Sequence, residues 1–181
     1  NPQEVLAVLT YEDNITQGNS HLRVWVSTIQ EETLRWELLS DIGSIPMENN
    51  TATRLFVEKD DYTLAVAGFL PFGGQNKWGI YRINGVDGSV DTVTWSNINV
   101  NETGKSIAYD KSRNYYFVFG GRNGANLLND MYLVRGNDGY TLTLASPSAQ
   151  LPSVRENASL EVSPYSEKLY LYGGIDSLSQ E

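Results

Sequence analysis

The sequence predicts an all-β fold built from a repeated unit of antiparallel strands. Three segments repeat one another without a gap, and each combines alternating apolar residues, a polar turn and a closing glycine. These segments are TRLFVEKDDYTLAVAG, SIAYDKSRNYYFVFGG and SLEVSPYSEKLYLYGG, at residues 53–68, 106–121 and 159–174. Between them lie short alternating runs separated by Gly, Asn, Asp, Ser and Pro, which are typical of strands and turns.

The length of the repeat predicts an architecture within this class. Gly68 and Gly120 are 52 residues apart, and Gly120 and Gly173 are 53 residues apart. A strand repeat of this length indicates a stacked or radial array, and we expect a portion of a β-propeller with four-stranded antiparallel blades.

Each complete unit is expected to hold four strands joined by hairpins. The expected strands of the second unit are residues 53–58, 62–68, 78–84 and 91–97. Those of the third unit are residues 106–110, 115–120, 131–136 and 140–145. Polar turns join neighbouring strands at residues 59–61, 87–89, 110–114 and 137–139.

The two terminal units are expected to be incomplete. The first offers strands at residues 4–10, 21–27 and 34–39, and the last only at residues 159–163 and 168–173. The predicted strand counts are therefore three, four, four and two, in blades at residues 1–48, 49–100, 101–153 and 154–181. Unpaired strand edges promote aggregation, so we expect the remainder of a longer propeller, or another chain, to complete the end blades.

Composition limits the chemistry that the chain can carry. Its 181 residues include 13 basic and 22 acidic residues, giving a net charge of −9, with no cysteine and His21 as the single histidine. An acidic surface repels nucleic acid phosphates, and the lack of cysteine excludes disulfides, thiolate metal sites and thiol nucleophiles. No apolar run approaches the ~20 residues of a membrane helix, so we expect no membrane insertion in this segment.

The third unit resembles a kelch repeat. Residues 116–121, YFVFGG, look like the apolar strand of that family with its double glycine, and residues 129–134, NDMYLV, look like its strand opened by Asp. Residues 169–174 repeat the double-glycine element, whereas the first two units are degenerate. The resemblance implies a kelch-like β-propeller, similar also to the propeller domain of galactose-oxidase-like proteins. Their copper site uses histidines, tyrosines and a cysteine, so nothing of it carries over to this chain.

The repeated glycines have a structural interpretation that does not depend on the family. Gly68, Gly120, Gly121, Gly173 and Gly174 close apolar strands where the backbone must take a positive φ or approach a neighbouring blade. A phosphate-binding loop is the alternative, but the run Gly-Gly-Arg-Asn-Gly precedes a strand and not a helix N-terminus. We interpret these residues as structural kelch glycines.

Acidic turn residues are the candidates for chemistry. Asp60, Asp61, Asp87 and Asp91 could supply the paired carboxylates of a glycoside hydrolase, but turns favour acids in any case. Calcium needs several oxygen ligands at short spacing, for which Asp60-Asp61 and Asn137-Asp138 are too sparse. We predict no catalytic, cofactor-binding or metal site in this chain.

Four asparagines lie in glycosylation sequons, namely Asn14, Asn49, Asn101 and Asn157. Asn49 and Asn101 are 52 residues apart and so occupy the same connection in successive units, and Asn157 lies at the matching connection before the fourth unit. In an up-and-down blade these connections and the turn that carries Asn14 emerge on one rim. We therefore expect one glycan-bearing face on a secreted or cell-surface protein. The alternative is a cytoplasmic protein in which the sequons are accidental.

Three functions stay open. The first is a non-catalytic module for protein or glycan binding or surface assembly, because loops on rigid blades carry function in such scaffolds. Its candidate partner-binding residues lie in the turns opposite the sequons, and they are Lys59, Asp60, Asp61, Asp87, Lys111, Arg113, Asn137 and Asp138. The second is part of a carbohydrate-active enzyme whose catalytic residues lie outside this chain. The third is an architectural subunit that builds a filament or ring through open blade edges.

Overall fold

The protein is all-β, as the sequence predicts. The computed structural model describes residues 5–14, 16–30, 33–46, 52–58, 62–143 and 152–176, and these residues contain strands and turns but no α-helix. Accordingly, the described part of the chain holds no helix that could cross a bilayer.

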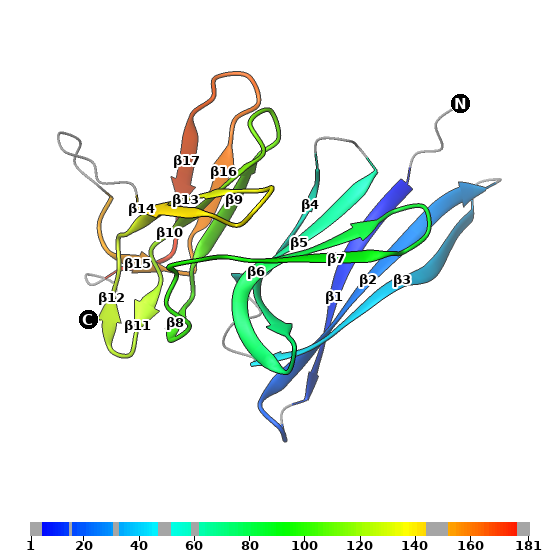
Figure 1. The fold of residues 1–181 in the computed structure, drawn as a ribbon, viewed down its shortest axis with the longest axis horizontal. Coiled ribbons are helices and arrows are strands. Elements are labelled where there is room, and N and C mark those ends of the chain that lie inside the picture. The colour runs from blue at the N-terminus through cyan, green and yellow to red at the C-terminus, as the bar shows by residue number, and fades with distance from the viewer. Residues whose placement is uncertain are drawn as a thin grey trace.

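Four main antiparallel sheets follow one another along the chain, with three, four, four and two strands (Figure 1). Sheet 1 contains β1 (Val5–Asn14), β2 (Asn19–Gln30) and β3 (Thr33–Pro46). Sheet 2 contains β4 (Arg54–Val57), β5 (Thr63–Phe72), β6 (Gln75–Asn84) and β7 (Val90–Thr94). Sheet 3 contains β9 (Ser106–Asp110), β10 (Tyr115–Phe119), β13 (Met131–Arg135) and β14 (Thr141–Thr143). Sheet 4 contains β16 (Ser159–Val162) and β17 (Leu169–Tyr172).

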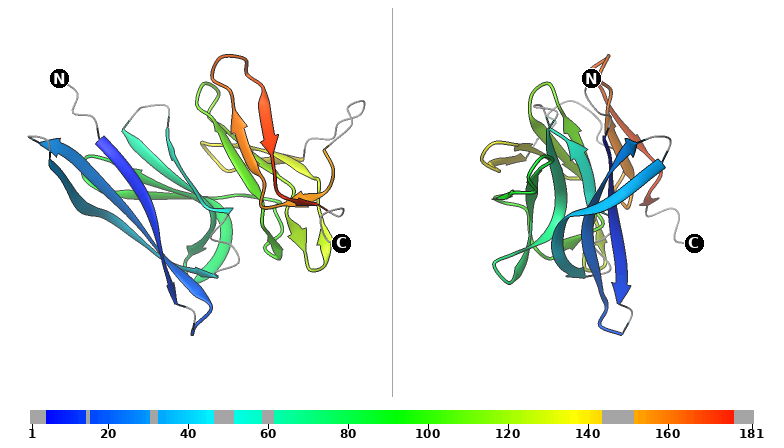
Figure 2. Two further views of the ribbon diagram at one scale, coloured as in Figure 1. Left: turned by 180° about the vertical axis from the view of Figure 1, so that it is seen from behind. Right: turned by 90° about the vertical axis from the view of Figure 1, so that its right-hand side faces the viewer.

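The predicted strand counts are therefore confirmed, and no sheet closes on itself within the described ranges. Sheet 1 packs on sheet 2 and sheet 4 packs on sheet 3, and Figure 2 shows the four sheets following one another from the blue to the red end of the chain. This succession is compatible with propeller blades.

Two small sheets were not predicted. One joins β8 (Glu102–Thr103), β11 (Arg122–Asn123) and β12 (Asn126–Leu127), and the other joins β15 (Arg155–Glu156) and β18 (Ile175–Asp176). In both small sheets, the segment just before the first main strand of a unit (β8 or β15) pairs with the segment just after the double glycine of the same unit (β11 or β18). Two-residue ladders have no periodicity to detect, so only their repetition in both units identifies them.

Several strands are longer than the sequence predicts. Strand β6 begins at Gln75 because Gly73 and Gly74, with φ of 57° and 83°, make a tight hairpin after β5. Strand β3 runs for 14 residues against β2 with two register shifts. Such bulges interrupt the alternation of apolar residues, which hides the length of the strand from sequence reading.

Sheets 2 and 3 each pack through both of their faces. We call the face turned toward the next sheet along the chain the forward face and the opposite one the rear face. On β5, Leu64 and Val66 pack on sheet 1, while Ala65 and Ala67 pack toward sheet 3. Successive side chains of a strand point to opposite faces, so a run of apolar residues fills two interfaces at once.

Three apolar clusters hold the four sheets together. Between sheets 1 and 2 lies a cluster that includes Leu22, Val24, Ile42, Ile45, Leu64, Val66, Leu70 and Ile83. Between sheets 2 and 3 lies a larger one that includes Ala65, Ala67, Phe69, Trp78, Ile80, Trp95, Ile107, Tyr116, Val118, Tyr132 and Val134. Between sheets 3 and 4 lies a small one centred on Ala108, Phe119 and Leu160.

A buried polar link also joins sheets 2 and 3. The guanidinium of Arg82 on β6 donates to both carboxylate oxygens of Glu58 at 2.8 and 2.9 Å, and the hydroxyl of Tyr116 on β10 donates to the same carboxylate at 3.0 Å. Burial, with the Glu58 charge beside it, raises the pKa of Tyr116 far above its usual range, so this hydroxyl stays protonated. Arg82 also donates to the Gly136 carbonyl of sheet 3. Removing one partner of such a buried pair costs about 3–5 kcal/mol.

The double glycine of the third unit lies where the backbone passes against the fourth unit. Gly120 and Gly121 have φ of 63° and 94°, and the N–H of Gly121 donates to the Arg155 carbonyl at 2.8 Å. A Cβ on Gly120 would overlap the Arg155 carbonyl, and one on Gly121 would overlap that of Thr103. The buried ammonium of Lys105 donates to the Gly120 carbonyl at 2.9 Å.

The other repeated glycines divide into two kinds. Gly173 and Gly174 have positive φ like the first pair, at 67° and 84°, and a Cβ on Gly174 would lie 2.7 Å from the Glu156 carbonyl oxygen. Gly68 has an ordinary φ, but a Cβ there would lie 2.8 Å from the Thr53 hydroxyl. Close approach is therefore shared by Gly68 and Gly174, whereas Gly173 has a left-handed backbone with open space around its Cβ position.

Replacing Gly120 by alanine tests this close approach. We expect G120A to lose about 1–2 kcal/mol of stability for its left-handed backbone and a further ~1–3 kcal/mol for the overlap with the Arg155 carbonyl. Chemical denaturation measures both. The matched control is G124A, since Gly124 has φ of 59° but open space around its Cβ position. Equal losses in the two variants would show that the contact between units carries no cost.

Candidate functional site

The hairpin turns of sheets 2, 3 and 4 gather at one end of the sheets, which we call the turn rim. It comprises Tyr62 and residues 84–90, 110–114, 135–140 and 163–168. Within sheet 2 the N–H of Gly85 donates to the Tyr62 carbonyl at 2.8 Å, and within sheet 3 the N–H of Gly136 donates to the Asn114 carbonyl at 2.8 Å. The same backbone bond thus ties adjacent turns together in two units.

Exposed apolar side chains project from this rim. Tyr165 and Val86, at the tips of the β16–β17 and β6–β7 turns, are 97% and 80% exposed, and Tyr62 and Tyr140 are exposed as well. Tyrosine is enriched at interfaces because it combines a large apolar ring with a polar tip. The turn rim therefore has the composition of a binding surface.

A cleft of about 390 Å³ opens on the turn rim between sheets 3 and 4. It is lined by Tyr109, Asp110, Lys111, Ser112, Arg113, Val162, Ser163, Pro164 and Glu167. Arg113 crosses it, pairing with Asp110 of its own turn at 2.8 Å and with Glu167 of the next unit at 2.5 Å. The cleft thus offers an apolar floor with charges of both signs at its edge.

Asp110 organises one wall of this cleft. Its carboxylate accepts hydrogen bonds from the N–H of Ser112 at 3.0 Å, the Ser112 hydroxyl at 2.7 Å, the N–H of Arg113 at 3.2 Å and the guanidinium of Arg113 at 2.8 Å. Burial alone would raise the pKa of Asp110, but these bonds outweigh it and hold the pKa below its usual value. In sheet 4 the equivalent Ser163 accepts from the N–H of Ser166 at 3.2 Å.

The other residues that the sequence singled out on this rim form turns. Asp87 accepts from the hydroxyl and N–H of Ser89 at 2.6 and 2.9 Å, and these bonds lower its pKa. Asn137 accepts from the Asn114 amide at 2.7 Å, and Asp138 pairs with Arg135 at 2.7 Å. Lys111 is exposed. Lys59, Asp60 and Asp61 lie outside the described residues.

One predicted turn is partly covered. The N–H of Ser96 donates to the Gly139 carbonyl at 3.1 Å, and the N–H of Thr141 donates to the Ser96 hydroxyl at 3.1 Å. Gly139 is buried there, against the Thr94 carbonyl. The β13–β14 turn therefore docks on the end of β7, and of the predicted turn residues 137–139 only Asn137 and Asp138 stay exposed.

The described sequons lie at the other end of the sheets. Asn14, Asn101 and Asn157 are exposed, and they lie at the β1–β2 turn, before β8 and after β15. The N–H of Asn157 donates to the Gly104 carbonyl at 2.8 Å, so the connections that carry Asn101 and Asn157 lie side by side. The β1–β2 turn, β8 and the β11–β12 hairpin share the lower edge of Figure 1. Asn49 lies outside the described residues.

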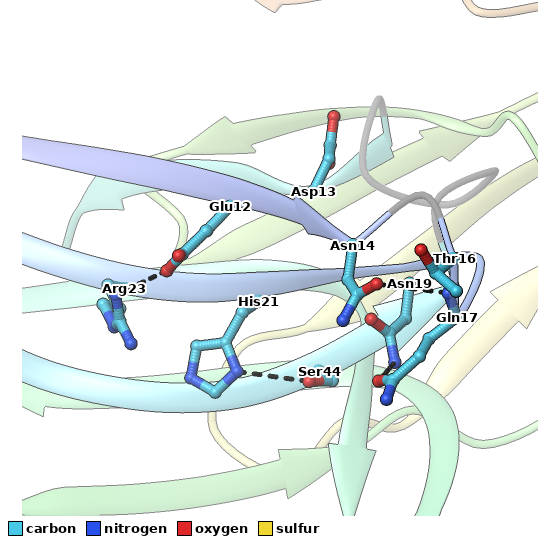
Figure 3. Close-up of a pocket in the computed structure, with 9 residues that line it drawn as sticks. All are labelled: Glu12, Asp13, Asn14, Thr16, Gln17, Asn19, His21, Arg23 and Ser44. Atoms are coloured by element: carbon cyan, nitrogen blue, oxygen red, sulfur yellow. Dashed lines mark hydrogen bonds and ion pairs between the residues drawn. The ribbon is translucent and has the colours of Figure 1, made fainter.

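A second cleft, of about 510 Å³, adjoins Asn14 on sheet 1 (Figure 3). It is lined by polar and charged residues, namely Glu12, Asp13, Asn14, Thr16, Gln17, Asn19, His21, Arg23 and Ser44. Arg23 pairs with Glu12 at 2.7 Å and with Asp41 at 3.4 Å. The open, amide-rich lining suits a hydrated ligand or simply water.

His21 lies between two partners in this cleft. Its Nε2 is 2.6 Å from Asp41 Oδ1, and its Nδ1 is 3.2 Å from the Ser44 hydroxyl. These residue types are those of a hydrolytic triad, but the N–H of Gly43, beside Ser44, is bonded to Asp41 and does not serve as an oxyanion donor. Burial would raise the pKa of Asp41, while His21 and Arg23 lower it below its usual value. His21 and Arg23 on β2 thus form side-chain hydrogen bonds with Asp41 and Ser44 on β3, which add to the backbone pairing of the two strands.

Sequence reasoning missed two features of these rims. It assigned partner binding to charged turn residues and overlooked the exposed tyrosines, which a strand pattern does not distinguish from core positions. It also left His21 without a role, because Asp41 and Ser44 are distant in sequence and meet it only through the β2–β3 register. Their position inside turn sequences, as in Ser163-Pro164-Tyr165-Ser166, could have indicated that these tyrosines are exposed.

Comparison with known proteins adds no relative: no family model matches the chain, and no curated protein matches it. Among the described residues, no group of three or more His, Asp or Glu side chains has the arrangement of a metal site.

Replacing Asp110 by asparagine tests the wall of the turn-rim cleft. Because its pKa is lowered, ionised Asp110 stabilises the fold above pH ~4, and this contribution is lost as pH falls through the folded-state pKa. We expect D110N to lower the free energy of unfolding by about 1–2 kcal/mol at pH 7 and by progressively less below pH ~4. Urea denaturation at a series of pH values measures this difference. The control D138N removes an exposed pair worth at most ~0.5 kcal/mol. A D110N deficit that is unchanged at low pH would contradict the role of the carboxylate.

Proposed function

We propose that the chain is a section of a kelch-like β-propeller that binds a protein or glycan partner through its turn rim. One observation carries the proposal: the hairpins of three successive sheets present exposed tyrosines and a cleft at the same end of the scaffold. Loops held by rigid strands are where such scaffolds place their binding residues. The charged side chains Lys111 and Arg113 add polar contacts at the cleft.

The kelch-like interpretation has structural support beyond the residue pattern. Successive antiparallel sheets pack face to face in chain order, and the double glycine of the third unit lies against the Arg155 carbonyl in the connection to the fourth unit. Both features are what a radial array of blades requires. Blade boundaries at residues 1–48, 49–100, 101–153 and 154–181 follow from this assignment.

A secreted or cell-surface location is part of the proposal. The sequons at Asn14, Asn101 and Asn157 are exposed and lie away from the turn rim. Glycans there would leave the exposed tyrosines accessible to a partner. A protein that displays one glycan-bearing face and one aromatic face suits recognition outside the cell.

Two other functions are distinguishable from this one. A carbohydrate-active enzyme would require catalytic residues outside this chain, and the turn-rim cleft would then act as a substrate subsite. An architectural subunit would pair through open strand edges, and in the incomplete sheets the edge strands are β1 and β3 in sheet 1 and β16 and β17 in sheet 4. In both cases the exposed tyrosines of the turns would have no central role.

A binding experiment tests the proposal. The chain, secreted from eukaryotic cells and tetramerised, is screened on an array of glycans and extracellular protein domains, and each ligand found is titrated. We expect the double variant Y62S/Y165S to weaken binding by tenfold or more, since buried tyrosines are frequent hot spots of interfaces. Calorimetry or surface plasmon resonance measures the change.

The control variant is N126A, an exposed residue on the β11–β12 hairpin at the opposite end, which should bind as the wild type does. Equal weakening by both variants would refute the turn rim as the binding surface. Mass spectrometry of the protein purified from its native source tests the location. Glycans on the peptides that contain Asn101 and Asn157 are expected, and bare peptides would overturn the secreted assignment.

A further inference from the structure

Asn14 lies at the edge of the polar cleft on sheet 1. It is the last residue of β1 and pairs with Asn19, the first residue of β2. The backbone N–H of Gln17 donates to the Asn14 carbonyl at 3.1 Å and lies 3.2 Å from the side-chain oxygen of Asn14. This second contact holds the carboxamide of Asn14 in one orientation.

That orientation turns the amide nitrogen of Asn14 into the cleft. Figure 3 shows the side-chain oxygen of Asn14 on the side of Gln17, and the nitrogen on the side of His21 and Ser44. The nitrogen is the atom to which a glycan is joined in an Asn-X-Thr sequon. Asn14 and Thr16, which define this sequon, are both exposed and both line the cleft.

The charged groups that line the cleft are already paired. Arg23 contacts Glu12 at 2.7 Å and Asp41 at 3.4 Å. The carboxylate of Asp13 accepts a hydrogen bond from the hydroxyl of Ser20 at 2.6 Å. Each lining carboxylate and the lining guanidinium thus has its own partner within sheet 1, and the cleft favours a neutral ligand over an ion.

Hydroxyl and carboxamide groups make up most of the remaining lining. Thr16 and Ser44 supply hydroxyls, and Gln17 and Asn19 supply carboxamides. These groups both donate and accept hydrogen bonds, which matches the hydroxyl and acetamido groups of a sugar. The volume of about 510 Å³ is within the range of small-ligand sites.

We propose that this cleft binds the first sugar residues of a glycan carried by Asn14. A tethered ligand needs little affinity of its own, because a short tether gives it an effective concentration in the ~mM range. Asn14 lines the cleft and supplies the tether, so its own glycan is the occupant and not a free saccharide.

The modification is a transfer from a glycosyl diphosphate donor. The amide nitrogen of Asn14 forms a bond to the anomeric carbon of the first sugar, and the bond from that carbon to the diphosphate breaks. The diphosphate leaves with the electron pair, and the nitrogen loses one proton. The product keeps the side-chain oxygen of Asn14, and with it the contact to Gln17.

The bound glycan joins parts of sheet 1 that are separate in sequence. It contacts the β1–β2 turn through Gln17 and Asn19, and β3 through Ser44, so it stabilises the three-stranded sheet. The inference goes beyond the proposed function and rests only on its secreted location. The glycan lies away from the turn rim and takes no part in partner binding there.

Site-resolved deglycosylation of the folded chain tests the proposal. The chain is secreted from eukaryotic cells and treated under native conditions with an amidase that cleaves the bond between glycan and asparagine. Mass spectrometry follows release from Asn14 and from Asn101, which lines neither of the two clefts described above. We expect release from Asn14 to be at least tenfold slower in the folded chain, and the two rates to be equal after denaturation.

A double variant shows whether the cleft causes the protection. N19A/S44A removes a carboxamide and a hydroxyl from the cleft and leaves the sequon intact, so it should accelerate release from Asn14 severalfold and leave Asn101 unchanged. The matched control N137A/S166A removes the same two groups from exposed residues of the turn rim and should change neither rate. Circular dichroism confirms that each variant is folded.

Thermal unfolding measures the stabilisation. T16A removes the sequon but keeps Asn14, so secreted T16A should unfold about 2–4 °C below the secreted wild type, the shift expected for one or two lost hydrogen bonds in a chain of this size. The same two proteins produced in bacteria carry no glycan and should unfold together. An equal difference in the bacterial proteins would assign the loss to Thr16 itself and overturn the proposal.

Three other results would also overturn it. They are equal release from Asn14 and Asn101 in the folded chain, release that N19A/S44A leaves unchanged, and secreted protein that carries a glycan on Asn101 but none on Asn14. These measurements use chains passed through a secretory pathway. A cleft that does not bind the glycan is therefore distinguished from a native protein that is never secreted, and from a turn rim that binds no partner.

Discussion

The packing of each sheet against the next is the constraint on which the rest of the structure depends. Sheets 2 and 3 each have two apolar faces, and a single antiparallel sheet cannot shield both from water. The interface between sheets 2 and 3 shows how this is resolved. Tyr116 is completely buried there, with its ring 5.8 Å from Phe56 and 5.8 Å from Trp95, while its hydroxyl bonds to Glu58. The units are therefore stable as neighbours and not as independent domains.

This constraint separates the scaffold from the surfaces that can carry function. Strand interiors are committed to two interfaces at once, so variation is tolerated at the rims, where turns and connections end. One rim presents tyrosines and a cleft, and the other presents the sequon asparagines and a polar cleft.

The sequence predicted the main strands better than it predicted the short ladders, the bulges and the side-chain contacts around them. Alternation and the spacing of Gly68, Gly120 and Gly173 were sufficient for the class and for the strand counts, because both derive from the period of a strand. The two-residue ladders at β8 and β15 and the bulges of β3 escaped detection, since neither produces a period. The His21 cluster escaped for another reason: its members meet only through register, which a single sequence does not specify.

The resemblance to kelch repeats rests on features with a physical cause in this structure. The double glycine of the third unit has positive φ at both residues, and its backbone lies against the Arg155 and Thr103 carbonyls. Only residues without a side chain fit such an approach. In the second unit, Gly68 meets the Thr53 side chain instead, which explains why a single glycine is sufficient there.

A double-mutant cycle between sheets 2 and 3 tests the face-to-face succession of sheets most directly. The variants E58A and Y116F each remove one partner of the bond between the Tyr116 hydroxyl and the Glu58 carboxylate, and urea denaturation gives their stabilities alone and together. If the two sheets face each other as described, the losses are non-additive, with a coupling of about 1 kcal/mol or more. Strict additivity would mean that these side chains do not meet and would contradict the packing from which the whole account is built.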